Sequence, residues 1–186
     1  MDSFIDSYVS ADALDNAIAG IRQSPSDEGV LELIVCRPGV GQRTVLSTAQ
    51  LTVDEGLVGD NWKARGLKHG EANPAMQINI MNARSAAAVA GDRSRWPLAG
   101  DQFYVDFDLS DDNLPPGTQV QIGHAVLEIT AEPHLGCRKF AERFGKDAVM
   151  FVNSDVGKAL NLRGINAKVI VPGAVAVGDT IKKRSE

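Results

Sequence analysis

The sequence has very little cysteine and no long apolar run, and both shortages limit what the protein can be. Its two cysteines, Cys36 and Cys137, lie far apart and form neither a Cys-x-x-Cys pair nor a zinc-type cluster. The sequence does not decide whether the two form a disulfide, although a reducing compartment disfavours one. No stretch approaches the roughly 18 apolar residues of a membrane span, and the acidic N-terminal segment does not resemble a secretory signal. We therefore expect a cytoplasmic protein with no membrane contact.

The chain also lacks a basic excess and the common catalytic motifs. Lysine and arginine number 19 against 24 acidic residues, which gives a net charge of −5 and a pI near 5.2. Non-specific nucleic-acid binders usually carry a strong basic excess, so we expect no nucleic-acid partner. The sequence contains no GxSxG, GxGxxG or HExxH motif, and no flavin, haem or iron–sulfur motif.

What remains is the composition of an ordinary globular domain that is rich in turns. The 186 residues are 44% apolar and 23% charged, which suits one sizeable hydrophobic core. The 18 glycines and 8 prolines favour short strands over a helical bundle. Apolar residues have helical spacing over the first 23 residues or so. We therefore expect residues 1–28 to form a helical extension packed on a domain that spans residues 29–186.

Strand patterns dominate from residue 30 onward and predict a barrel. Helical spacing is limited to short stretches, at 83–90 with Asn82 as the cap, at 138–144 and near 154–160. Roughly seven or eight strands predict a mainly β fold, a closed or nearly closed, largely antiparallel barrel with a few peripheral helices. The expected strands are 30–37, 44–53, 76–82 and 102–109, a hairpin over 118–130 that turns at Gly123-His124, and a second hairpin over 166–181 that turns at Pro172-Gly173.

Cys137 is the residue best placed for chemistry. It follows a Pro-x-x-Gly loop and directly precedes a predicted helix that carries Arg138 and Lys139. A helix N-terminus and neighbouring cations both favour a thiolate, which can serve as a nucleophile or as a ligand for a soft metal. The alternative is a small buried hydrophobic residue, as most free cysteines are. Cys36 lies in an apolar strand, and we expect it in the core.

Three further features could contribute to a site. The loop over residues 56–71 combines glycines with Lys63, Arg65 and His69, and such a loop can bind an anion. The alternative is an ordinary solvated loop. Arg163 stands before a late strand and could bind a phosphate or a carboxylate, or could be a plain surface arginine. His134 is three residues from Cys137, close enough to assist it, although sequence proximity alone does not establish a Cys-His pair.

In their order and spacing, six segments resemble the MOSC domain family, named for the C-terminal domain of molybdenum cofactor sulfurases, and in particular its stand-alone bacterial members. The resemblance covers most of the chain, from about residue 56 to residue 181. It rests on GLVGD (56–60), MQINIMN (76–82), a long segment with LAGDQFYVDFDLS and NLPPGTQVQIGHAVLEIT (98–130), HLGCRKFAERFG (134–145), LRGINAKVIVPG (162–173) and VGDTI (177–181).

The resemblance implies a β-barrel with a cysteine that ligates the molybdenum of a pterin cofactor or carries sulfur as a persulfide. That cysteine corresponds to Cys137. Many members carry Pro-Arg-x-Pro-Cys there, whereas this chain has His134 in place of the arginine and Gly136 in place of the proline. We expect no pyridoxal phosphate, because that chemistry belongs to a fused desulfurase domain. The residues that we expect to bind the cofactor, from the resemblance and the local charges together, are Gly59, Asp60, Lys63, Arg65, Asn113, His134, Arg138, Arg163 and Gly164.

The function expected from this resemblance is a reductase of small N-hydroxylated compounds. Cys137 is then both the metal ligand and the catalytic residue, and a separate protein donates the electrons. Two alternatives stay open. Cys137 could carry a persulfide, or the domain could bind the cofactor, another ligand or a partner without turnover.

Overall fold

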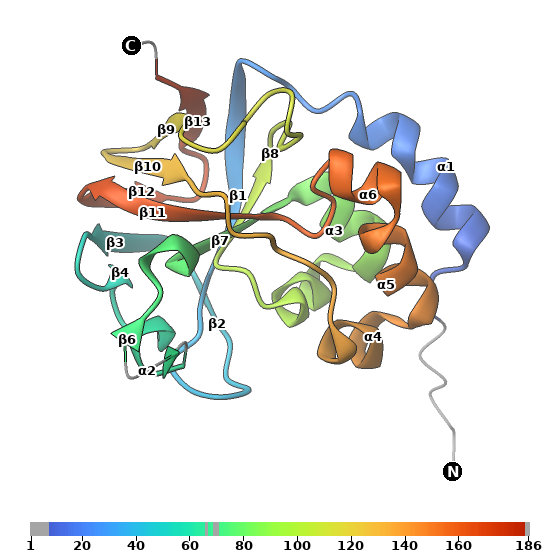
Figure 1. Ribbon diagram of the computed structural model, residues 1–186, viewed down its shortest axis with the longest axis horizontal. Coiled ribbons are helices and arrows are strands. Elements are labelled where there is room, and N and C mark those ends of the chain that lie inside the picture. Colours follow the sequence, from blue (N-terminus) through green and yellow to red (C-terminus); the bar gives the residue numbers. More distant parts are fainter. Residues whose placement is uncertain (1–7, 66, 69–70, 185–186) are drawn as a thin grey trace.

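Seven strands close into a β-barrel in the part of the chain that the structure describes (Figure 1). The structure is a computed structural model and describes residues 8–65, 67–68 and 71–184. The first seven residues of the predicted helical extension, and His69, therefore lie outside the described residues. The barrel strands, in spatial order, are β13 (Thr180–Lys183), β9 (Gln119–Ile122), β10 (Ala125–Ile129), β11 (Ile165–Val171), β7 (Ile78–Asn82), β8 (Phe103–Asp106) and β1 (Glu28–Cys36), and β1 pairs with β13 to close it.

The predicted fold class is confirmed, with one parallel pair. β7 and β8 run parallel, because α3 and η2 cross between them, and the other barrel pairs of the described residues are antiparallel. Apolar side chains from alternate strand positions fill the barrel, as a sheet with one face turned inward requires. The interior includes Leu31, Ile34, Ile80, Phe103, Val105, Ile122, Leu127, Ala167 and Ile181.

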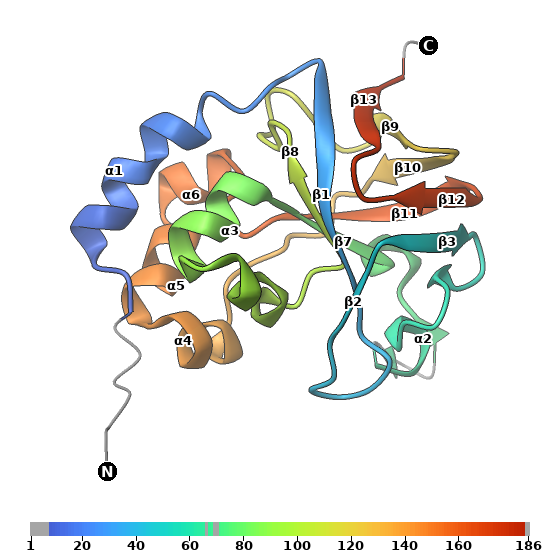
Figure 2. The ribbon, with the colours of Figure 1, turned by 180° about the vertical axis from the view of Figure 1, so that it is seen from behind.

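Two predictions about the strands are wrong in detail. The expected single strand over 44–53 divides at Ser47 into β2 (Thr44–Leu46), which pairs with β1, and β3 (Thr48–Thr52). The expected closing hairpin at Pro172-Gly173 does not form, because β12 (Gly173–Ala176) pairs with β3 and not with β11 (Figure 2). Short strands complete this side of the molecule: β4 (Gly56–Leu57), β5 (Leu67–Lys68) and β6 (Glu71–Ala72).

Most helices cover the opposite side of the barrel (Figure 1). They are α1 (Ala11–Ile21), α3 (Ala83–Ala90), the 3-10 helix η2 (Arg93–Ala99), α4 (Arg138–Phe144), α5 (Lys146–Asn153) and α6 (Asp155–Ala159). A second apolar cluster joins them to the outer faces of β1, β7 and β8, and contains Leu33, Val35, Met81 and Tyr104. Two further turns, α2 (Trp62–Arg65) and η1 (Pro74–Met76), lie near β6.

Local signals placed several of these helices correctly. The Asn82 side chain accepts hydrogen bonds from the backbone N–H groups of Arg84 and Ser85 and so caps α3, as predicted. The expected helices over 138–144 and near 154–160 form as α4 and α6, whereas α5 was not predicted. Among the described helices, none is both long and apolar enough to cross a bilayer.

Candidate functional site

A buried ion pair lies beneath the end of the barrel where β1 finishes. Arg37 directly follows β1, and its guanidinium donates to both carboxylate oxygens of Asp60 at 2.8 Å. The side chains are 1% and 0% exposed. Gly59 has φ +87° and so permits the turn that brings Asp60 to this position. The ion pair therefore holds one arginine rigidly at the base of the site.

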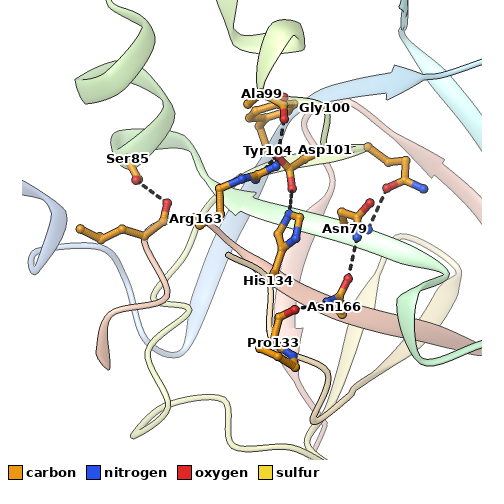
Figure 3. A network of polar contacts seen from close by, with 12 residues as sticks. Asn79, Ser85, Ala99, Gly100, Asp101, Tyr104, Pro133, His134, Arg163 and Asn166 are labelled. Atoms are coloured by element: carbon orange, nitrogen blue, oxygen red, sulfur yellow. Dashed lines mark hydrogen bonds and ion pairs between the residues drawn. The ribbon is translucent and has the colours of Figure 1, made fainter. Parts of the chain in front are cut away.

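Two asparagines connect this arginine to the loop that carries His134. Arg37 Nη1 donates to Asn79 Oδ1 at 2.7 Å, and Asn79 Nδ2 donates to Asn166 Oδ1 at 2.6 Å. Asn166 in turn donates to the carbonyl of Glu132 and to that of Pro133, the second of which Figure 3 shows. These bonds join β7 and β11 to the 132–134 segment, and so fix the backbone just before His134.

His134 and Arg163 share one buried carboxylate. His134 Nε2 lies 2.7 Å from Asp101 Oδ1, and Arg163 Nη1 donates to Asp101 Oδ2 at 2.6 Å (Figure 3). Burial acts to raise the pKa of Asp101, but the Arg163 charge and the hydrogen bonds outweigh it and hold that pKa below its usual value. Burial, and then Arg163, lower the pKa of His134. At neutral pH the ring is therefore neutral, with its proton on Nε2 toward Asp101 and Nδ1 as an acceptor.

Four consecutive backbone carbonyls, which we call the carbonyl arc, each accept a hydrogen bond from a different arginine. The arc runs through residues 97–100 at the end of η2. Its carbonyls accept hydrogen bonds, in chain order, from Arg43 (3.2 Å), Arg143 (2.7 Å), Arg163 (2.9 Å) and Arg37 (2.8 Å). Because successive carbonyls point in different directions in a turn, arginines from four distant segments converge here.

These arginines line a cavity of about 230 Å³, which we call the cationic cavity. Its lining includes Arg65, Lys139 and Cys137 besides the four arginines, and no carboxylate among the described residues. Asp60 and Asp101 neutralise Arg37 and Arg163. The other cations have no carboxylate partner within the described part of the chain. Burial, with nearby cations adding to it, lowers the pKa of Arg43 and of Arg65. An anion in this cavity would relieve that repulsion.

Two buried polar atoms on the cavity wall have no partner among the described residues. They are Nε of Arg163 and Oδ1 of Asn61. Buried polar groups are nearly always hydrogen-bonded, so an unpaired donor and acceptor on one cavity wall mark where a polar ligand could bind. Together with the excess of cations, this fits a polar, anionic group and does not fit an apolar one.

Cys137 is exposed and lines the same cavity at the start of α4. Its carbonyl accepts from the N–H groups of Phe140 and Ala141, whereas its side chain makes no capping bond. Phe140 is buried and lies beneath the Arg163 guanidinium, 5.0 Å from carbon to ring centroid. The thiol is therefore accessible from outside, at the edge of a cationic cavity. Cys36, by contrast, is 7% exposed in the barrel core, and burial raises the pKa of its thiol.

Comparison with known proteins decides the family. The sequence model of the MOSC domain matches residues 68–182. The chain belongs to the MOSC domain family.

Solved structures agree with this assignment at the level of the fold. YuaD from Bacillus subtilis superposes with a TM-score of 0.64 at 18% identity, over 86% of this chain and 97% of that one. YiiM from Escherichia coli gives 0.55 at 18% identity, over 84% and 70%. A crystal structure titled only as a hypothetical protein gives 0.60 at 19% identity, over 90% and 72%. A comparison with curated protein sequences finds no match.

In this MOSC domain the structure brings together only part of the predicted site. Cys137, Arg65, His134 and Arg163 line the cationic cavity. Gly164 lines a neighbouring cavity, and its φ of +117° lets the chain pass close to the Ile80 carbonyl. Asp60 pairs with Arg37, which lines the cavity, and Gly59 permits the turn that places Asp60.

Three predicted residues lie elsewhere on the molecule. Lys63 pairs with Asp54 on the surface. Arg138 is 92% exposed and pairs with Glu142. Asn113 fastens its own turn through the Asp108 carbonyl and accepts from the Lys183 ammonium. None of the three belongs to the lining of the cationic cavity as the structure describes it.

Sequence reasoning missed Arg37, Asn79 and Asp101. It also missed Arg43 and Arg143, the other two arginines of the carbonyl arc that were not predicted. One signal was available, because an arginine directly after an apolar strand must either end the strand at the surface or find a buried carboxylate. The other residues carry no local signal, since each comes from a different segment of the chain.

Proposed function

We propose that this MOSC protein binds the molybdenum pterin cofactor in the cationic cavity, with Cys137 as the protein ligand to the metal. The observation that carries the proposal is the convergence of the carbonyl arc's arginines and an accessible thiol on one cavity, in whose described lining no carboxylate is found. A pterin cofactor is polar and carries a phosphate, which arginines bind well. A thiolate is a suitable ligand for a soft metal.

The cavity's residues fit such a group in distinct ways. Arg43 and Arg143 are held by carbonyls and have no carboxylate partner among the described residues, so they suit a phosphate. The unpaired Oδ1 of Asn61 offers an acceptor to a polar ring. Arg65 and Lys139 complete the positive wall.

We propose the activity to be reduction of a small N-hydroxylated compound. The substrate takes up two electrons and two protons, its N–O bond breaks, and water leaves. When bound, the cofactor supplies a metal centre that passes electrons to the substrate, and a separate partner protein supplies them to the metal. His134, neutral and oriented by Asp101, can accept or pass a proton through Nδ1 at the edge of the same cavity.

Metal and pterin analysis tests the cofactor proposal. The wild type, Cys137→Ser and the double variant Arg43→Gln/Arg143→Gln are purified anaerobically from molybdate-fed cells. We expect stoichiometric molybdenum and pterin in the wild type, loss of molybdenum in Cys137→Ser, and loss of both in the double variant. Arg138→Gln is the matched control, because it removes an exposed cation next to Cys137 and should keep both. A wild type without metal or pterin contradicts the proposal.

One observation favours a second function, which is that the Cys137 thiol is exposed. As a sulfur carrier, Cys137 would attack the persulfide of a cysteine desulfurase, take its terminal sulfur and release the desulfurase thiol. Mass spectrometry of the chain after incubation with a desulfurase and cysteine tests this. A gain of one sulfur atom in the wild type, absent from Cys137→Ser, supports the carrier function. No gain in the wild type excludes it.

A further inference from the structure

A second and larger cavity, which we call the apolar chamber, adjoins the cationic cavity and has no role in the proposed cofactor binding. Its volume is about 590 Å³, and it lies between the ends of β10 and β11 and the helices α5 and α6. Apolar side chains form most of its wall. They include Leu114, Pro116, Ile129, Leu135, Val152 and Ile165.

Size and lining identify the apolar chamber as a small-molecule site. Sites for small organic ligands usually have about 300–1,000 Å³ and an apolar wall with a few polar groups. The apolar chamber meets both conditions, whereas the cationic cavity, at about 230 Å³, is smaller and polar. The two cavities therefore favour different chemistry.

The chamber wall carries only solvent-exposed charges besides one paired arginine. Asp111, Glu132 and Lys158 are exposed, and Arg163 is already neutralised by Asp101. Both exposed carboxylates already accept a hydrogen bond from an amide group. Asn161 donates to Asp111 at 2.9 Å, and Asn73 donates to Glu132 at 3.3 Å. A ligand with a net charge therefore gains little from this wall, and an uncharged one loses little.

His134 and Arg163 form the wall that both cavities share. Asp101 holds the two side chains from behind at 2.7 and 2.6 Å. Nε of the arginine is buried and has no partner among the described residues. The one hydrogen bond found for the histidine ring among them uses Nε2, so Nδ1 is not engaged in it. The shared wall thus offers one acceptor, Nδ1 of His134, and one donor, Nε of Arg163, to a ligand in the apolar chamber.

We propose that the apolar chamber binds the uncharged, apolar body of the substrate and that the substrate's polar group contacts His134 and Arg163 at the shared wall. The substrate class is then a neutral compound with an aromatic or aliphatic body, and not a charged nucleotide. Binding in the apolar chamber stands by itself, and its assignment to the substrate rests on the proposed function.

Three probes of one shape and different charge test the binding. The neutral 2-naphthamide, the anionic 2-naphthoate and the cationic 2-naphthylmethylamine are titrated into metal-free protein with labelled methyl groups. We expect 2-naphthamide to bind with a millimolar or lower Kd and to shift the methyl signals of Leu114, Ile129, Val152 and Ile165. The two charged probes should bind no more tightly. Shifts confined to other residues, no shifts, or a charged probe that binds about tenfold more tightly overturn the proposal.

A pair of alanine substitutions supplies the control. Ala131 lies exposed on the chamber wall, and Ala174 lies exposed on β12, outside that wall. Ala131→Trp should fill the chamber and weaken 2-naphthamide binding about tenfold or more, whereas Ala174→Trp should leave it unchanged. Equal effects in the two variants contradict the proposal.

Cofactor content separates the two proposals. If the chamber holds the substrate, Ala131→Trp keeps as much molybdenum and pterin as the wild type. Loss of both from Ala131→Trp would assign the chamber to the cofactor and overturn its assignment to the substrate. If the wild type binds 2-naphthamide in the chamber but contains no cofactor, the proposed function fails while the binding site stands.

Discussion

Removal of the Asp60 carboxylate should destabilise the protein far more than loss of a surface charge. Among the described residues, Asp60 accepts four hydrogen bonds at 2.8–3.0 Å, three from Arg37 and one from the Trp62 backbone N–H. Asp60→Ala leaves the guanidinium buried without its counter-charge. Breaking a fully buried ion pair from one side costs about 3–5 kcal/mol. That is a large part of the ~5–15 kcal/mol by which domains are usually stable.

Urea unfolding followed by far-ultraviolet circular dichroism measures this cost at constant pH. The control Arg138→Ala breaks an exposed pair and should change the free energy of unfolding by at most about 0.5 kcal/mol. The double variant Arg37→Met/Asp60→Leu should recover about half the loss or more, because two apolar side chains can replace a buried ion pair. A loss of under about 1 kcal/mol in Asp60→Ala would refute the reasoning.

Three further predictions follow from the same contacts. Gly164→Ala should lose about 2 kcal/mol or more of unfolding free energy in urea, because its Cβ would lie 2.4 Å from the Ile80 carbonyl oxygen at φ +117°. The pKa of His134 is lowered in the folded state, so its contribution to stability is complete above the unfolded pKa and falls as the pH drops below it, by about 1.4 kcal/mol per pH unit. Wild-type stability should therefore fall more steeply than that of His134→Gln between pH 7 and pH 5, and parallel curves would contradict this. Asn82→Ala should cost about 1 kcal/mol or more, because it removes the α3 cap and buried bonds to Ser24 and the Phe107 carbonyl, and thermal unfolding would show it as a lower Tm.

The cationic cavity and the apolar chamber differ in charge, size and lining. The cationic cavity carries positive charge and an accessible thiol, and the apolar chamber has the volume and lining for an organic molecule. His134 and Arg163 belong to both. The family resemblance implies an arginine at the position of His134, and a histidine there can be neutral at the shared wall.

The sequence by itself determined the fold class and several of the local elements. Asn82 before an alanine-rich stretch predicted α3 and its cap, because an asparagine side-chain oxygen readily accepts from the backbone N–H groups that open a helix. Gly123-His124 predicted the β9–β10 hairpin, because a tight turn needs a residue such as Gly123 at positive φ, here +54°. Alternating apolar residues predicted a sheet with one buried face, and the barrel follows from it.

Beyond the β9–β10 hairpin, only the tertiary structure decided which strands pair and which side chains meet. β12 follows β11 closely in sequence but pairs with β3, because apolar alternation shows which face of a strand is buried and does not show its neighbour. The same holds for the site. Arg37, Arg43, Arg143 and Arg163 come from distant segments and are brought together by four successive carbonyls. Backbone carbonyls are present in every sequence, so no residue pattern announces where they will gather charged side chains.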